Sequence, residues 1–496
     1  MQALPAEIFT VSQIRALERY AIEALGVPAR TLMERAGEAA FAALGTCWPS
    51  AQRIVVLCGA GNNAGDGYVL SRLARADRLN VIAVPLSDPA ALPADARAAY
   101  EQYIAAGGKV DRWENVDFKH ANVIIDAIFG TGLNRRIDAA LCEKIIATNA
   151  ANVPILALDI PSGLHGDTGQ ILGAAIRAHR TVTFGGLKLG FYVGEGVNYT
   201  GTVMFDDLGI PADAPVKQLP EACRIDDEFV SSVLTPRNRT THKGAQGHVL
   251  LIAGGSGMGG AARLAGEAAL RAGAGLVTVA TRAENIAGII AGCPELICRA
   301  IESAPALTPL LERADVLAVG PGLGQDSWAE TMVQAALDAD KPTVVDADAL
   351  NLLARQPRRR TNWILTPHPG EAGRLLGWST QQVQSERLNA AREIARRYGG
   401  VAVLKGAGTI VLQDAHLPAI CDRGNPGMAS AGMGDVLTGI IAGVVAQVSD
   451  LWDAARAGVI AHATAGDFAA HRGERGLLAS DLFAQLQKCV NPLPRS

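Results

Sequence analysis

The chain has 496 residues, of which 49% are hydrophobic and 5% aromatic, with a formal net charge of −4 at pH 7. This length exceeds one ordinary hydrophobic core, so we expect two or three domains, and the composition favours α/β folds and argues against disorder. The mild charge and the lack of a basic tract argue against nucleic-acid and membrane-surface partners.

Eight scattered cysteines without a Cys-x-x-Cys pair indicate a reduced, cytoplasmic protein. The first residues lack the basic and apolar regions of a signal peptide, and the longest apolar stretch is too short to span a bilayer. We also expect a homo-oligomer.

The first elements along the chain are expected to be helices. Thr10 and Gln13 form a capping-box pattern, and Thr31 and Glu34 repeat it before a second helix that ends at Gly45. The apolar stripe of the first helix consists of Ile14, Leu17, Ala21 and Leu25.

Short apolar runs then alternate with helical segments, which predicts buried parallel strands in a doubly wound sheet. The runs are residues 54–58, 81–86, 123–128, 155–160 and 181–184, with a probable edge strand at 201–208. Residues 210–219 are proline-rich and lack periodicity, so we place a linker there between domains 1–215 and 225–496. A second alternating series follows at 248–253, 276–281, 316–320, 343–346, 363–366 and 401–405.

A glycine-rich loop, Gly-Ala-Gly-Asn-Asn-Ala-Gly-Asp-Gly, occupies residues 59–67 between an apolar run and a helical run. Such a loop presents free backbone N–H groups to an anion, and the helix dipole adds to the attraction. The simplest alternative is a strand-to-helix turn in which Asn and Asp act as caps. Two amides and a carboxylate are unusual in a plain turn, so we favour ligand binding.

Polar side chains also end two later strands. Asp126 and Asp159 lie where the carboxyl ends of parallel strands meet, together with Asn63 and Ser162. This oxygen-rich set suits a hard cation, although either aspartate alone could simply cap the loop that follows it.

These motifs resemble the NAD(P)H-hydrate epimerase family over about residues 1–215. The resemblance implies a Rossmann-like α/β/α fold that acts on the hydrated nicotinamide ring, with a potassium ion held by Asn63, Asp126 and Ser162. Ala64 stands where the family usually has Gly. The implied substrate contacts are Asn62, Asn63, Ala64, Gly65, Asp66, Gly130, Thr131, Gly132, Leu133, Asn134, Arg135, Arg136 and Asp159.

Asp159 is our candidate for catalysis in this half. Epimerisation requires the ring hydroxyl to leave and to return on the other face, and a carboxylate beside it can donate and recover the proton.

The second half carries five glycine loops at strand ends, at residues 254–261, 320–324, 366–371, 405–409 and 430–435. Each alone would more often be a turn, but together they indicate a nucleotide crevice. Asp435 follows Ala-Gly-Met-Gly at an expected helix start, where backbone N–H groups can hold phosphoryl oxygens while the carboxylate takes a hydroxyl proton. Its simpler role would be a helix cap.

This set resembles the ADP-dependent NAD(P)H-hydrate dehydratase family over about residues 225–490, which implies a ribokinase-like fold, ADP as co-substrate and a magnesium ion. Asp435 would be the catalytic residue. Many relatives have Tyr near the position of Met258 and Gly259. The implied hydrate contacts are Ala261, Gly322, His368 and Asp435, and the implied nucleotide contacts are Lys405, Gly406, Ala407, Gly408, Thr409 and Gly434.

The two halves together therefore resemble bifunctional enzymes of nicotinamide nucleotide repair. Such an enzyme would epimerise the R and S forms of NAD(P)H hydrate and dehydrate the S form to NAD(P)H, converting ADP to AMP and phosphate. A small-molecule kinase is one rival, since ribokinase-like folds serve that chemistry too. A nucleotide-binding module is another, and the loop spacing disfavours a dehydrogenase. The sequence does not distinguish ADP from ATP as the phosphoryl donor, or NADH hydrate from NADPH hydrate as the preferred substrate.

Overall fold

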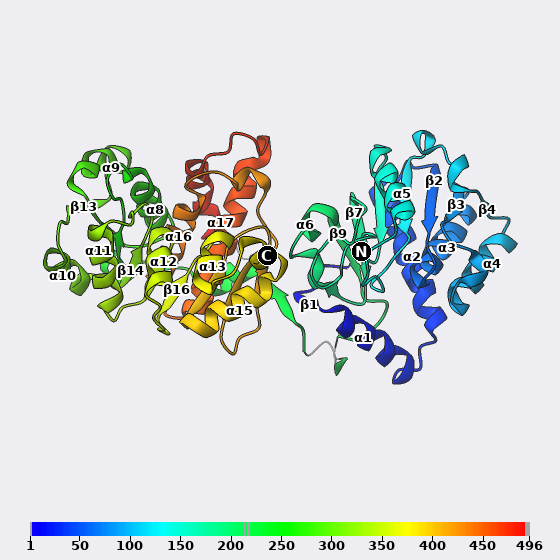
Figure 1. Cartoon of the computed structure of the whole chain (residues 1–496), viewed down its shortest axis with the longest axis horizontal. Coiled ribbons are helices and arrows are strands. Elements are labelled where there is room, and N and C mark those ends of the chain that lie inside the picture. The colour runs from blue at the N-terminus through cyan, green and yellow to red at the C-terminus, as the bar shows by residue number, and fades with distance from the viewer. Residues whose placement is uncertain (1, 213, 216–218, 492–496) are drawn as a thin grey trace. The chain divides into compact units, whose positions relative to one another are not determined.

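The computed structural model describes residues 2–212, 214–215 and 219–491. Two compact units, Met1–Cys223 and Arg224–Ser496, make up the chain. Each unit is an α/β fold built around a sheet (Figure 1). Of the linker expected at 210–219, residues 213 and 216–218 lie outside the described residues, whereas Ile210 and Ala214 are buried in the first unit's core.

The sheet of the first unit has seven parallel strands in the order β4-β3-β2-β5-β6-β7-β9. Its strands are β2 (Arg53–Cys58), β3 (Asn80–Pro85), β4 (Lys109–Val110), β5 (Val123–Ala127), β6 (Ile155–Leu158), β7 (Arg180–Phe184) and β9 (Thr202–Asp206). The doubly wound sheet and its edge strand are thus confirmed, and the short strand β4 is an addition to the prediction.

Helices cover both faces of this sheet. Ile54 and Val56 of β2 face a core cluster that includes α2 (Ala29–Cys47), α3 (Asn62–Ala76) and α4 (Ala94–Ala105). Val55 and Leu57 face the opposite cluster, to which α5 (Ala139–Ala150) contributes Ile145. The alternation is the period of two expected of a strand that is buried on both faces. A small ribbon adds β1 (Glu7–Phe9), which pairs with β8 (Leu187–Lys188) and with β10 (Ala222–Arg224); the unit also contains α6 (Gly196–Tyr199).

The first helix, α1 (Val11–Glu23), begins as the sequence indicates. Thr10 and Gln13 form the expected capping box, with the Thr10 N–H donating to Gln13 Oε1 at 2.8 Å. The second expected helix start is wrong, because α2 begins one turn earlier, after Pro28, without a side-chain cap. Thr31 already donates its N–H to the Pro28 carbonyl at 2.8 Å and so lies inside the first turn. Proline next to a helix start costs nothing, since the N–H it lacks would have no partner there.

The second unit contains the strand order β13-β12-β11-β14-β15-β16-β17-β18-β19. Strands from β13 to β17 are parallel, and β18 and β19 continue antiparallel. Their bounds are β11 (His248–Ile252), β12 (Leu276–Thr281), β13 (Ile297–Ala300), β14 (Val316–Val319), β15 (Thr343–Val345), β16 (Trp363–Leu365), β17 (Val401–Leu404), β18 (Thr409–Gln413) and β19 (Ala419–Cys421).

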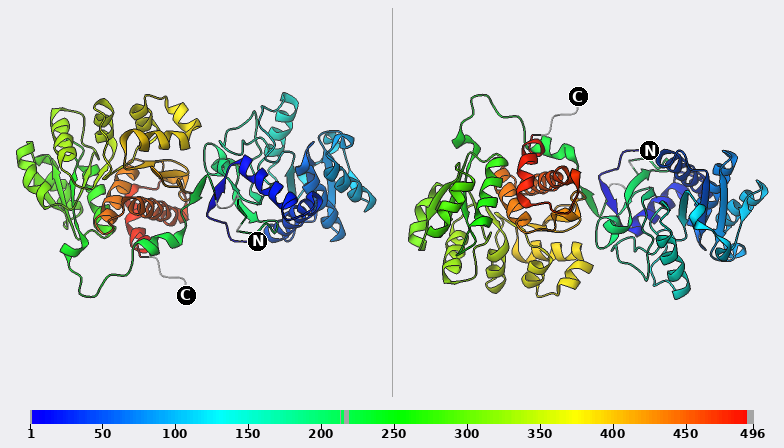
Figure 2. Two further views of the ribbon diagram at one scale, coloured as in Figure 1. Left: turned by 90° about the horizontal axis from the view of Figure 1, so that it is seen from below. Right: turned by 90° about the horizontal axis from the view of Figure 1, so that it is seen from above.

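Helices flank this sheet, and the C-terminal ones, coloured orange to red, pack within the unit (Figure 2). They are α7 (Asp227–Val233), α8 (Gly259–Arg271), α9 (Ile286–Gly292), α10 (Ala304–Arg313), α11 (Ser327–Asp338), α12 (Ala347–Arg355), α13 (Pro369–Leu376), α14 (Thr380–Ser385), α15 (Arg387–Tyr398), α16 (Met433–Val445), α17 (Leu451–Ala469) and α18 (Phe483–Cys489).

Helix α16 is the buried centre of this unit. It packs closely on α8, because a Cβ at Gly439 would lie only 2.0 Å from the Ala265 carbonyl oxygen, and one at Gly443 only 2.5 Å from that of Ala269. Its apolar run therefore serves the core. None of the helices within the described residues is long and apolar enough to cross a membrane.

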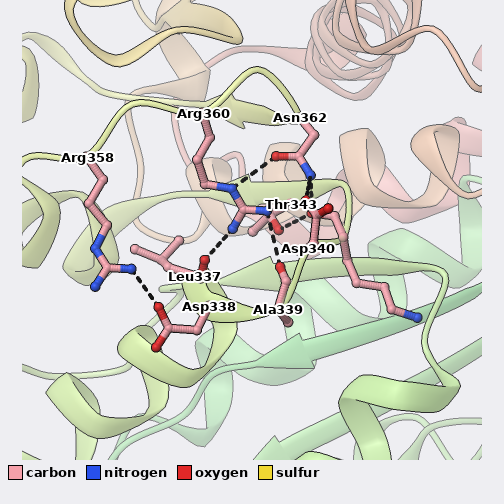
Figure 3. A network of polar contacts seen from close by, with 9 residues as sticks. Leu337, Asp338, Ala339, Asp340, Thr343, Arg358, Arg360 and Asn362 are labelled. Carbon is pink, nitrogen blue, oxygen red and sulfur yellow. Dashed lines mark hydrogen bonds and ion pairs between the residues drawn. The ribbon is translucent and has the colours of Figure 1, made fainter.

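A polar network holds the end of α11 against the loop before β16 (Figure 3). The Arg360 guanidinium donates to the carbonyl oxygens of Leu337 and Ala339, and to Asn362 Oδ1 at 3.0 Å. Leu337 lies in the last turn of α11 and Ala339 directly follows the helix, so neither carbonyl has an intrahelical partner. Arg358 instead pairs with Asp338 at 2.8 Å on the surface.

All eight cysteines lie within the described residues as thiols, and five of them are buried: Cys58, Cys293, Cys298, Cys421 and Cys489. Burial raises the pKa of Cys58 and of Cys421 to about 12 and that of Cys293 to about 11.

Candidate active sites

Oxygen atoms converge at the carboxyl ends of β5 and β6. Asp126 and Ser162 are fully buried, and the Ser162 hydroxyl donates to Asp126 Oδ1 at 2.6 Å. Asn63, from the first turn of α3, donates its Nδ2 to the carbonyls of Phe129 and Leu158 at 2.9 and 3.2 Å. Its Oδ1 is buried and has no hydrogen-bond partner. An orphaned carbonyl-type oxygen beside a buried carboxylate suits a hard cation, because the ion would satisfy it.

Burial raises the pKa of Asp126 to about 6, although the Ser162 hydrogen bonds oppose the shift. A nearby cation would favour the ionised carboxylate. Within the described ranges there is no group of three or more His, Cys, Asp or Glu residues that could hold a metal ion. Asn63, Asp126 and Ser162 offer amide, carboxylate and hydroxyl oxygens, which suit a hard cation, and not the sulfur and imidazole ligands that zinc prefers.

Asp159 follows β6 and has a φ of +66°, in the left-handed region that residues with a side chain rarely adopt. Such strain persists where the surroundings hold the residue, as they often do at active sites. Two contacts orient its carboxylate: Lys188 Nζ lies 2.5 Å from Oδ1, and the Thr131 N–H donates to Oδ2 at 3.2 Å.

Lys188 is the main residue of this site that sequence reasoning missed. Its ammonium group is fully buried and also donates to Thr183 Oγ1 at 2.7 Å and to the Phe184 carbonyl at 2.9 Å. The available signal was a lone lysine within an otherwise apolar glycine-rich stretch, residues 185–190. A buried charge is tolerated only when paired, so this lysine and Asp159 depend on each other.

A cavity of about 550 Å³ opens beside these residues. Many of the predicted substrate contacts line it: Asn62, Asn63, Asp66, Gly130, Thr131, Gly132, Leu133, Asn134, Arg135 and Asp159. Ala64 and Gly65 are buried beneath it, where a Cβ on Gly65 would lie 2.4 Å from Met33 Sδ, and Arg136 is outside the cavity lining. Because Ala64 lies in the first turn of α3 without a positive φ, its presence in place of glycine causes no strain.

Helix α1 supplies a wall of the cavity that the sequence did not reveal, through Arg15, Glu18 and Ile22. Asp66 is held inside: burial, followed by the negative charges of Asp159 and Glu18, raises its pKa well above the ordinary value. The cavity lining therefore includes three carboxyl groups, and one of them, that of Asp159, is paired with the buried Lys188.

In the second unit, Asp435 lies in the first turn of α16, after Gly432, whose φ of +87° bends the chain into the helix. Burial raises the pKa of Asp435 to about 7, and the negative charge of Asp346 adds to the shift. A base with a pKa near neutral is well matched to accepting a hydroxyl proton.

Lys405 lies beside this carboxylate, in a network that sequence reasoning found only in part. Lys405 Nζ is 2.6 Å from Asp346 Oδ1 and 3.8 Å from Glu371 Oε2, and the Thr438 hydroxyl donates to Asp346 Oδ2 at 2.7 Å. Burial lowers the pKa of Lys405, but Asp346 and Glu371 outweigh it, so the pKa is raised. Gly434 is part of the same group, since a Cβ there would lie 3.3 Å from Lys405 Nζ.

The buried Arg387 holds the loop that follows Lys405 through hydrogen bonds to its backbone. Its guanidinium donates to the carbonyl oxygens of Leu404, Lys405 and Gly408 at 3.2 to 3.4 Å, and a Cβ on Gly406 would lie 3.0 Å from it. The predicted nucleotide loop, which also includes Ala407 and Thr409, is thus fixed by an arginine that no motif indicated.

His368 caps α13. Its Nδ1 accepts from the Gly370 N–H at 2.9 Å, so the proton of the neutral ring is on Nε2, and burial together with the positive charge of Lys405 lowers its pKa. The predicted hydrate contacts Ala261 and Gly322 lie against each other, since a Cβ on Gly322 would be 2.9 Å from that of Ala261.

Comparison with known proteins covers both units. A family described as NAD(P)H-hydrate dehydratase matches residues 249–488, and one described as YjeF-related protein N-terminus matches residues 29–190. The chain is 45% identical to the bifunctional NAD(P)H-hydrate repair enzyme Nnr of Escherichia coli, over 99% of this chain and 95% of that protein. It is 46% identical to the enzyme of the same name from Coxiella burnetii, over 97% and 98%. The crystal structure of a ribokinase-like superfamily protein from Enterococcus faecalis matches 54% of this chain and 95% of its own, with 32% identity and a TM-score of 0.50.

Proposed function

The chain belongs to the family of bifunctional NAD(P)H-hydrate repair enzymes, and from this membership we propose how its residues divide the work. The enzyme epimerises the R and S forms of NAD(P)H hydrate and dehydrates the S form to NAD(P)H. We assign epimerisation to the first unit and ADP-dependent dehydration, which gives AMP and phosphate, to the second. The observation that carries the assignment is Asp435, a carboxylate with a pKa of about 7 at the start of α16, beside Lys405.

In dehydration, Asp435 accepts the proton of the hydrate's hydroxyl as that oxygen attacks the terminal phosphoryl group of ADP. The N–H groups at the start of α16 and the Lys405 ammonium hold the phosphate oxygens, because both present positive charge. Phosphate then leaves the ring together with a proton from the neighbouring carbon, which restores the double bond of NAD(P)H. His368, Ala261 and Gly322 hold the ring.

Magnesium fits this site as an ion held mainly by phosphate and water, since Asp346 and Glu371 are already committed to Lys405. When bound, it would neutralise charge on the phosphates.

In epimerisation, Asp159 moves the hydroxyl proton, and Lys188 keeps its carboxylate in place at 2.5 Å. Potassium fits the orphaned Asn63 Oδ1 together with Asp126 and Ser162. Its charge would hold the first turn of α3, which carries Asn63, to the loop that carries Ser162. Asn62, Asp66 and residues 130–135 surround the substrate.

The test is incubation with both epimers of NADH hydrate and ADP or ATP, with chromatographic separation of the epimers and assay of free phosphate. A repair enzyme consumes both epimers and releases phosphate and NADH, with ADP preferred. A stable phosphoester product would identify a small-molecule kinase instead. We also propose a cytoplasmic homo-oligomer, to be checked by light scattering and cell fractionation.

A further inference from the structure

Helix α1 is fixed rigidly at the edge of the first cavity. The Val11 N–H donates to Asp167 Oδ1 at 2.6 Å, and the capping box of Thr10 closes the first turn. Ile14 and Leu17 are fully buried beneath the helix. The side chains on its other face are therefore held in defined positions by an anchored backbone.

Arg15, Glu18 and Ile22 form the face of α1 that lines the cavity. They are spaced three and four residues apart, so they lie one above the other on the helix. Arg15 Nη2 donates to the Thr131 carbonyl at 3.2 Å, and the N–H of the same Thr131 donates to Asp159 Oδ2 at 3.2 Å. One residue of the substrate loop thus connects α1 to Asp159.

The carboxyl group of Glu18 interacts with the groups at the centre of this cavity. The residue lines the cavity, although it is exposed as a whole. Desolvation there, followed by the negative charge of Asp159, raises its pKa, while Lys188 and Arg15 oppose the shift. Asp66 is the remaining titratable group that faces it.

Asp159, unlike Glu18, has an ion-pair partner within hydrogen-bonding distance in the described part of the chain, the buried Lys188. Lys188 forms an ion pair with Asp159 and is fully committed to it, to Thr183 and to Phe184. The cavity is therefore lined by two unlike carboxyl groups. That of Asp159, which follows β6, is paired with a cation, whereas that of Glu18, on α1, has a raised pKa. Two carboxyl groups in such unlike electrostatic surroundings can act one as acid and the other as base.

We propose that Glu18 is the second proton-transfer residue of the epimerase, working with Asp159. This inference rests on the epimerase activity proposed above. Departure of the ring hydroxyl consumes one proton and releases water and a cationic ring, and addition of water to the other face returns one proton. Glu18 donates in one direction while Asp159 accepts, and the roles exchange in the reverse direction, so protons balance and no other reactant is needed.

Glu18→Gln in the full-length enzyme tests this, with Glu23→Gln as the matched control. Both substitutions remove one carboxylate from α1, but Glu23 is exposed and outside the cavity lining. We expect Glu18→Gln to lower kcat for epimerisation by roughly 10²-fold or more, with KM nearly unchanged, because proton transfer is lost while binding is kept. Glu18→Asp should recover part of the rate. Dehydration of the S epimer should stay normal in every variant.

The pH dependence of the epimerisation rate separates proton transfer by Glu18 from a purely structural role, which would leave the shape of the profile unchanged. Epimerisation by the native enzyme should fall toward high pH as Glu18 loses its proton, and this limb should be absent in Glu18→Gln. Epimerisation at the rate of the Glu23→Gln control would overturn the proposal, and so would a change confined to KM. A native enzyme that dehydrates without epimerising would refute the epimerase assignment instead. If Glu18→Gln unfolds at the same temperature as the native enzyme, a lower epimerisation rate does not come from a folding defect.

Discussion

Asp435 is a base with a pKa of about 7 at the start of α16, so its role can be tested by the pH dependence of the dehydration rate. Because its pKa is about 7 and a base must be ionised, the dehydration rate should rise with pH through about 7 and level off above it. Asp435→Asn should lower the rate by roughly 10²–10⁴-fold and abolish this dependence, since it keeps the shape but not the proton acceptor. Steady-state rates of NADH recovery between acid and mildly alkaline pH provide the measurement.

The exposed Asp414, in the same unit, gives a control in which Asp→Asn should change nothing. ADP binding by Asp435→Asn should persist, because backbone groups and Lys405 provide it. Near-normal turnover of Asp435→Asn would show that the proton goes elsewhere.

Asp159 offers a prediction that separates the two activities. Asp159→Ala should leave dehydration untouched, because the two sites share no side chains and belong to separate cores. The variant should consume the S epimer at the normal rate, while the R epimer disappears only as fast as it epimerises spontaneously. A chromatographic time course that resolves both epimers decides this.

Asp159→Ala also strands the buried Lys188, so Asp159→Asn serves as a second variant that keeps a hydrogen-bond acceptor for it. Equal, fast loss of both epimers in both variants would remove Asp159 from the mechanism.

At the scale of elements, the Arg360 network predicts a difference between neighbouring arginines. Arg360→Ala should lower the free energy of unfolding by about 1–3 kcal/mol, because the carbonyls of Leu337 and Ala339 lose a charged donor at the end of α11. Arg358→Ala, which removes only a surface ion pair with Asp338, should change it by about 1 kcal/mol or less. Urea denaturation of the two variants compares them, and equal effects would contradict the assigned cap.

Sequence patterns predicted elements well where local signals were strong. The apolar runs at 54–58 and 248–253 became β2 and β11, and the Thr10 capping box started α1. The antiparallel strands β18 and β19 were missed, because they are short and follow a glycine loop that already had a functional interpretation.

The same limit applies to the sites. Asp435 and Asn63 could be proposed from the sequence because they lie within glycine motifs at strand ends. Lys188, Glu18 and Arg387 were not, because each is a single residue outside a motif and meets its partners only in the folded chain. Burial and charge pairing identify such residues, and neither can be read from local spacing.

At the scale of the whole molecule, two units with separate cores predict two separable enzymes. A fragment of residues 224–496 should fold and dehydrate the S epimer without epimerising the R form, because each unit is of normal domain size. It should begin no later than Arg224, whose guanidinium pairs with Asp422 at 2.7 Å. An inactive fragment would count against the expected boundary between domains 1–215 and 225–496.

Thiol burial has a consequence for the conditions in which the molecule can operate. The thiolate is the form of cysteine that attacks peroxides and disulfides, and a pKa of about 12 at Cys58 and Cys421 leaves almost no thiolate there at neutral pH. An aromatic disulfide reagent should therefore titrate at most Cys47, Cys142 and Cys223 in the native protein, and all eight cysteines after unfolding. We therefore expect the enzyme to keep its activity at oxidant concentrations that inactivate enzymes with exposed, ionised thiols.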